Sequence, residues 1–174
     1  TIEGTFFPTS TFLDFKLTGQ QGDVMKESMN VAKTLAWNYT ELCTRSKLIE
    51  KFSKTYSQGI HVHCSEGSVS KDGPSAGAAI TSVIYSLLNN IPIKNDIAVT
   101  GEIDLHGNIS AVGGIENKFL GGIRSGVKTF LYPKDNKNDF DNFFNKYEDK
   151  AFLKEIDRKS TRLNSSHVSE SRMP

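Results

Sequence analysis

The 174-residue sequence has little cysteine, no excess of charge of either sign and no long hydrophobic run. Its two cysteines, Cys43 and Cys64, form no Cys-x-x-Cys pair, which argues against a structural metal site. Free thiols are the simpler reading and one disulfide is the alternative. The net charge of +1, from 21 basic and 20 acidic residues, gives no attraction for nucleic acid or an anionic membrane. The apolar stretch at residues 76–88 is too short and too polar to span a bilayer.

Signatures of several enzyme classes are missing as well. The sequence has no Gly-x-x-x-x-Gly-Lys-Ser/Thr loop, so we expect no nucleotide-binding residues in this segment. It has no His-Glu-x-x-His pair either, and we expect no metal. His61 and His63 stand two apart on an expected strand and therefore share a face. Without an obvious third ligand, we interpret them as polar residues that line a cleft or pack beneath it.

Hydrophobic periodicity indicates an alternation of strands and helices. Residues 43–57 are charged and fit a helix or a loop, and Asp23 is a reasonable cap for the first helix. The order of elements predicts a single α/β (α+β) domain with a mixed β-sheet and flanking helices. The spacing predicts strands at 12–17, 59–64, 97–100 and 127–132, a hairpin at 102–109, and helices at 24–42, 75–88, 115–125 and 139–147.

The two ends of the sequence differ from its middle. The start has neither a basic stretch nor an apolar signal core, and we expect the sequence to be a piece of a longer protein. Residues 158–174 are serine-rich and lack periodicity. We expect them to form a disordered tail or to be a segment derived from cloning, and place the folded domain at residues 1–157.

The most informative segment reads Lys-Asp-Gly-Pro-Ser-Ala-Gly, at residues 71–77. A strand enters it, a Gly-Pro turn reverses the chain, and Ser75 opens a helix with small neighbours, which is typical of a nucleophile turn. The start of a helix offers unpaired N–H groups that can bind the oxyanion of a tetrahedral intermediate. The alternative is that Ser75 only caps its helix.

A serine hydroxyl is a weak nucleophile and needs a base. A lysine can serve when burial keeps its amine neutral, because the pKa of a free lysine is ~10.4. Lys118 lies among apolar and small residues in Gly-Gly-Ile-Glu-Asn-Lys-Phe-Leu, at residues 113–120, and is the candidate. The alternative is an ordinary surface lysine beside Glu116.

In their order along the chain, these segments resemble the active-site blocks of the Lon protease family. The matching blocks are residues 18–28, 71–77, 100–103 and 112–118, and the resemblance extends from Thr1 to about Asp149. It implies the Lon proteolytic-domain fold, here truncated at both ends. Four ordered blocks are more specific than any single short motif.

The resemblance also implies roles for individual residues. Ser75 and Lys118 would form a Ser–Lys dyad, in which Thr100 orients the lysine amine. Backbone N–H groups near Ser75 and at Asp72–Gly73 would form the oxyanion hole, and Asp72 would influence whether the site is open. The supporting positions near the site are His61, His63 and Glu102.

Similarity to Lon implies an ATP-dependent serine endopeptidase that degrades unfolded or damaged polypeptides as a homo-hexamer. ATP and magnesium would be bound by an AAA+ ATPase module outside this segment. We expect the mitochondrial matrix as the compartment, with a bacterial cytoplasm or the peroxisome as alternatives. Because no membrane or nucleic-acid signature is present, we predict neither as a partner.

Two other functions compete with the peptidase. A catalytically inactive Lon-like module would serve for oligomerisation or substrate docking, but this chain retains Ser75, Lys118 and Thr100. An unrelated ligand-binding domain could hold an anion at the helix start near Ser75. That reading does not explain Lys118 or the order of the four blocks.

Overall fold

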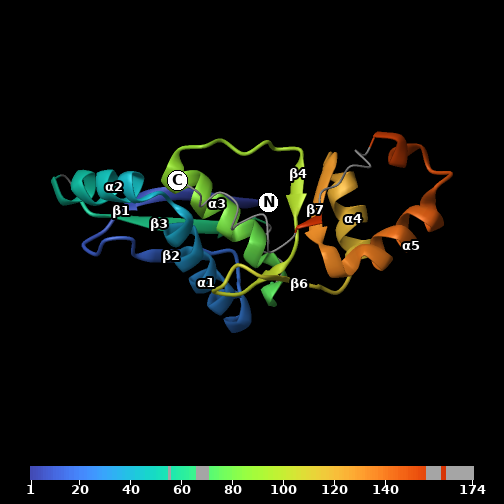
Figure 1. The fold of residues 1–174 in the computed structure, drawn as a ribbon, viewed down its shortest axis with the longest axis horizontal. Coiled ribbons are helices and arrows are strands. Elements are labelled where there is room, and N and C mark those ends of the chain that lie inside the picture. Colours follow the sequence, from blue (N-terminus) through green and yellow to red (C-terminus); the bar gives the residue numbers. More distant parts are fainter. Residues whose placement is uncertain (55, 66–70, 156–161, 164–174) are drawn as a thin grey trace.

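The computed structural model describes residues 1–54, 56–65, 71–155 and 162–163. Its elements fall into two halves that lie side by side along the long axis of the molecule (Figure 1). Each half has its own hydrophobic core. The relative position of the two halves therefore matters for any site that draws residues from both.

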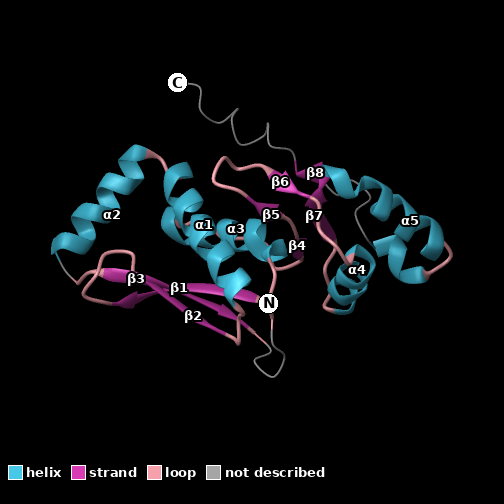
Figure 2. Cartoon of the chain, turned by 90° about the horizontal axis from the view of Figure 1, so that it is seen from below, coloured by secondary structure: helices cyan, strands magenta, loops and turns pink. Residues whose placement is uncertain are grey.

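The first half is built on a three-stranded sheet in the order β1-β3-β2. The strand β1 (Ile2–Pro8) is antiparallel to the central β3 (Gln58–Cys64), and β2 (Phe15–Thr18) is parallel to it. Ile60 and Val62 are fully buried because β3 alternates apolar and polar residues. The helices α1 (Asp23–Tyr39) and α3 (Gly77–Asn89) cover one face of this sheet (Figure 2).

The first predicted helix ends earlier than expected and a second helix follows it. Thr40 is buried, and both its hydroxyl and its N–H bond to the carbonyl of Ala36. A second helix, α2 (Leu42–Lys54), follows, in the segment at residues 43–57 for which the sequence predicted either a helix or a loop. The predicted cap was wrong. Gly22 occupies the cap position of α1, and Asp23 is already helical and pairs with Lys26 at 3.0 Å.

The second half packs aromatic residues between helices and a parallel sheet. The strand β7 (Thr129–Pro133) lies between β4 (Ile97–Val99) and β8 (Arg162–Leu163). The helices α4 (Ile115–Arg124) and α5 (Lys137–Tyr147) enclose the core. Phe119 is its centre, with four ring centroids 4.6 to 5.9 Å from its own, those of Phe130, Tyr132, Phe140 and Phe143.

A short hairpin projects from the end of β4. It consists of β5 (Glu102–Ile103) and β6 (Ile109–Ser110) in antiparallel pairing, as the sequence predicted. The Asp104 carboxylate closes its turn by accepting from the backbone N–H groups of His106 and Asn108. Hydrogen bonds from the Asn108 side chain and backbone lower the pKa of Asp104 below its ordinary value.

The fold class is confirmed, with one difference in how the strands assemble. Parallel and antiparallel pairings both occur, but they form three small sheets instead of one mixed sheet. The strand β1 was not predicted, and two residues of the expected tail pair with β7 as β8. The rest of that tail lies outside the described residues. In the part of the chain that is described, no helix is long and apolar enough to cross a membrane.

Removing the central ring of the second core should destabilise the whole domain. Phe119 is 2% exposed, so Phe119→Ala leaves a cavity and is expected to lower the free energy of unfolding by about 3–5 kcal/mol. Urea denaturation followed by circular dichroism measures this loss. Tyr56→Ala is the aromatic control at a side chain that is 77% exposed, and a change within about 0.5 kcal/mol is expected there. Equal losses in the two variants would contradict the assigned core.

Candidate active site

Ser75 lies in a tight turn that precedes α3. The turn η1 (Pro74–Ala76) is a single 3₁₀ turn, and α3 begins at Gly77, two residues later than the sequence predicted. Gly73 enters the turn with a φ of 111°, a conformation that favours glycine. Gly77 has no room for a side chain, because a Cβ atom there would lie 2.9 Å from the Ser28 hydroxyl. Small residues thus let the turn sit directly against α1.

The turn is bonded to the end of β4. The Ser75 carbonyl accepts hydrogen bonds from the Gly101 N–H, at 2.8 Å, and from the Thr100 hydroxyl, at 3.2 Å. The Ala78 N–H donates in turn to the Gly101 carbonyl at 3.0 Å. The Thr100 N–H donates to Leu131 on β7. These bonds connect the serine turn of the first half to the sheet of the second.

Lys118 is on α4, in the second half. Gly114, the cap residue of α4, has a φ of 70°, and its carbonyl accepts the Lys118 N–H. The Lys118 amine donates to the Gly113 carbonyl at 2.6 Å. Although the residue is exposed, desolvation by surrounding protein atoms lowers the pKa of Lys118 from the ordinary lysine value. No carboxylate among the described residues forms an ion pair with it.

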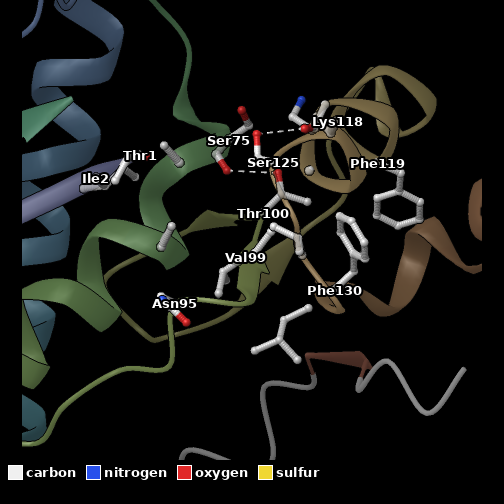
Figure 3. A pocket seen from close by; sticks show the side chains of 17 residues that line it. Thr1, Ile2, Ser75, Asn95, Val99, Thr100, Lys118, Phe119, Ser125 and Phe130 are labelled. Carbon is white, nitrogen blue, oxygen red and sulfur yellow. Dashed lines mark hydrogen bonds between the residues drawn. The ribbon is translucent and has the colours of Figure 1, made fainter. Parts of the chain in front are cut away.

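Ser75, Thr100 and Lys118 line the same pocket, of about 420 Å³, where the two halves meet. Ser75 comes from the turn before α3 and Lys118 from α4, and Figure 3 draws both at the upper edge of the pocket. Within the described chain, no hydrogen bond joins the Ser75 hydroxyl to the Lys118 amine, and the Thr100 hydroxyl contacts the Ser75 carbonyl and not the lysine. The apolar part of the lining includes Ala79, Ala98, Val99, Phe119, Phe130 and Leu131.

The other residues selected from the sequence lie outside this pocket. His61 and His63 do share a face of β3, and a ring nitrogen of each is within 2.9 Å of the Thr18 hydroxyl. Because that hydroxyl has one hydrogen, at least one of the two ring nitrogens must donate to it. Glu102 is exposed on β5. The described residues include no group of three His, Cys, Asp or Glu side chains that could hold a metal.

Asp72 and Gly73, the predicted neighbours of the oxyanion, bond to each other and to α1. The Gly73 N–H donates to Asp72 Oδ1 at 2.9 Å, and the Met25 N–H donates to the same oxygen at 3.0 Å. In this arrangement the Gly73 N–H is not available to an oxyanion. The second bond links the serine loop to a helix that precedes it in the chain by about fifty residues.

The amino-acid sequence of the chain is similar to that of a known protein family. Residues 1–166 match the family model described as the Lon protease C-terminal proteolytic domain. The chain belongs to the Lon protease family. The match extends beyond residue 157, where the sequence alone placed the end of the domain. Family membership excludes the alternative that the chain is an unrelated domain that binds an anion near Ser75.

Curated Lon proteins from distant organisms are similar to this Lon-family chain. It is 45% identical over 140 residues to the Lon protease of Fervidobacterium nodosum and 43% identical over 140 residues to that of Methanosphaera stadtmanae, which covers 80% of the chain each time. It is 44% identical over 129 residues to the mitochondrial Lon protease homolog of Phaeodactylum tricornutum, covering 72% of the chain. The chain spans only 14–16% of the length of these relatives.

Two features of the Lon-family site were not assigned from the sequence. Gly122 lets α4 approach β7, because a Cβ atom there would lie 2.6 Å from the Phe130 ring. Gly121 lines the pocket and has open space where a side chain would be. The two adjacent glycines in a helix were the available signal, because glycine is unfavourable in a helix interior.

The lowered pKa of Lys118 has a measurable consequence. We expect its amine to lose its proton at a pH below the ordinary lysine value of ~10.4. Between the two values the unfolded chain binds more protons than the folded one, so Lys118 makes the free energy of unfolding rise with pH there. Carbon-13 NMR of reductively methylated lysines measures the titration, with Lys118→Arg to assign the signal. A Lys118 signal that titrates at or above its value in unfolding urea would contradict the expectation.

Proposed function

We propose that this chain is a serine endopeptidase domain in which Ser75 is the nucleophile and Lys118 is the base. The observation that carries the proposal is that the two side chains line one pocket from opposite halves of the molecule, with the pKa of the lysine lowered by desolvation. A desolvated lysine is suited to the role because its neutral form is populated closer to neutral pH. The family match supports the same chemistry.

The reaction proceeds through two stages. The neutral Lys118 amine takes the Ser75 proton while the hydroxyl oxygen attacks the scissile carbonyl, and the negative charge develops on the carbonyl oxygen. Collapse of this intermediate breaks the C–N bond, and Lys118 gives its proton to the leaving amine. Water then hydrolyses the acyl-enzyme by the same steps, which restores the Ser75 hydroxyl. Backbone N–H groups of the serine turn stabilise the oxyanion.

Attack requires the lone pair of the neutral Lys118 amine to face the Ser75 hydroxyl, whereas the contact that the structure shows is an N–H donated to the Gly113 carbonyl. Thr100 is placed to assist, because its hydroxyl donates to the Ser75 carbonyl and keeps lone pairs free to accept from the amine. One threonine would therefore hold the serine turn and orient the base at the same time. This reconciles its observed contact with the role that the resemblance implies.

The setting of the domain is part of the proposal. We infer that the longer protein degrades unfolded or damaged polypeptides as a homo-hexamer, with ATP and magnesium bound by an ATPase module outside this segment. The sizes of the relatives support this, because the chain matches only a small part of each. We propose the mitochondrial matrix as its compartment, supported by the similar mitochondrial homologs of Phaeodactylum tricornutum and Ostreococcus lucimarinus.

A catalytically inactive Lon-like module is the second candidate. The observation in its favour is that the Lys118 amine bonds to Gly113 and not to the Ser75 hydroxyl. Such a module would bind unfolded chains in the same pocket without cleaving them. Binding and cleavage are therefore measured separately.

Cleavage of casein by the 174-residue chain tests the dyad. Ser75→Ala and Lys118→Ala should each lower the rate by about 10⁴-fold or more, because neither the nucleophile nor its base can be replaced. Ser82→Ala on α3 and Lys128→Ala serve as matched controls and should leave the rate unchanged. Hydrolysis that survives either dyad substitution would exclude the assignment. Casein binding without hydrolysis by the unmodified chain would favour the inactive module.

A further inference from the structure

The loop that carries Ser75 is attached to the start of α1. The Gly22 N–H donates to the Lys71 carbonyl at 2.7 Å, and the Lys71 N–H donates to the Gln20 carbonyl at 3.0 Å. Gln21 and Lys71 thereby form a parallel bridge. The chain just before α1 and the chain just before the serine turn thus run side by side.

Asp72 completes this attachment by capping a helix to which it does not belong. A helix cap usually supplies a side-chain oxygen to the N–H of its third residue, but α1 has Gly22 at the cap position and no side-chain cap of its own. The third residue of α1 is Met25, and its N–H donates to Asp72 Oδ1 at 3.0 Å. The negative carboxylate also sits favourably at the positive end of the helix dipole.

Gly22 is small because the Asp72 carboxylate occupies the space of its side chain. A Cβ atom at Gly22 would lie 2.3 Å from Asp72 Cγ and within 2.7 Å of both carboxylate oxygens. The backbone does not require glycine there, since its φ is −73° and its ψ is 176°. The contact with Asp72 is therefore the reason that glycine is needed at this position.

The same carboxylate orients the peptide that leads into the serine turn. Asp72 Oδ1 accepts from the Gly73 N–H at 2.9 Å as well as from Met25. Gly73 is the residue with the φ of 111° that starts the reversal into Pro74 and Ser75. Asp72 Oδ1 thus connects the first turn of α1, through Met25, to the Gly73 peptide that leads into the turn of Ser75.

We propose that Asp72 is a positioning residue that holds the nucleophile turn in register with α1, by capping that helix from outside it. The proposal rests on the proposed peptidase function. Its effect is on the placement of Ser75 and not on substrate binding, so loss of Asp72 should lower kcat and leave KM nearly unchanged. Misplacement of a catalytic group by about 1 Å can cost on the order of 100-fold in rate.

Hydrogen exchange and kinetics on the 174-residue chain test the proposal together. We expect Asp72→Ala to remove protection of the Met25 amide and to lower kcat for an unstructured fluorogenic peptide at least about tenfold, with KM within about twofold. Asp72→Asn keeps an acceptor oxygen and should restore both the protection and most of kcat. Asp23→Ala is the matched control, because it removes a carboxylate from the same end of α1 without touching the serine loop.

A double substitution tests the contact with Gly22 independently. Gly22→Ala should lower kcat by displacing the Asp72 carboxylate, and adding Gly22→Ala to Asp72→Ala should cost nothing further, because the conflict has been removed. Additive losses would overturn the proposal. So would an Asp72→Ala chain with unchanged or higher kcat, or equal losses in Asp72→Ala and Asp72→Asn.

The exchange measurement separates this proposal from the proposed function. If the unmodified chain cleaves nothing, the peptidase assignment fails, and the Met25 amide still reports whether Asp72 caps α1. If the unmodified chain is active and Asp72→Ala leaves Met25 protected, the positioning role fails and the peptidase assignment stands.

Discussion

The geometry of the site depends on the hydrogen bonds between the serine turn and the end of β4. The Ser75 carbonyl accepts from Gly101 and Thr100, and the Gly101 carbonyl accepts from Ala78. Gly101 is buried, and a Cβ atom there would lie 2.6 Å from the Ile109 side chain. Because β4 pairs with β7, which carries Phe130 into the core beneath α4, these bonds set how far the proposed nucleophile lies from its proposed base.

This connection explains why small residues accumulate around the site. Gly77 admits Ser28 of α1, Gly101 admits the hairpin that follows β4, and Gly122 admits the Phe130 ring against α4. Each glycine brings two backbones closer than an alanine would allow. Gly77 thereby fits the turn of Ser75 against α1 within the first half, and Gly122 fits the helix of Lys118 against β7 within the second.

Local patterns in the sequence predicted most of this fold, and contacts between distant residues account for what they missed. The sequence predicts α1, α3 and α4 from their hydrophobic periodicity, and the turn at residues 73–75 from its glycine and proline. These signals depend only on residues that are close together in the chain. The wrong cap at Asp23 has another origin, since the acceptor for Met25 comes from Asp72, on a loop that follows two helices and a strand. Likewise β1 is defined by its antiparallel pairing with β3, which lies about fifty to sixty residues later in the chain.

The same distinction applies to the site itself. The residue types of Ser75 and Lys118 and the order of their blocks indicated a dyad, but the sequence carries no information on which acceptor the lysine amine contacts. That choice is set by the left-handed cap at Gly114, which places the Gly113 carbonyl within reach of the amine. The Gly113 carbonyl accepts from an N–H of the amine, whereas in the proposed reaction the Ser75 hydroxyl donates to the lone pair of the neutral amine, so the two contacts use different parts of the same group. The structure thus holds the proposed base beside the pocket by an N–H donor, which leaves the lone pair of the neutral amine for the proposed proton transfer.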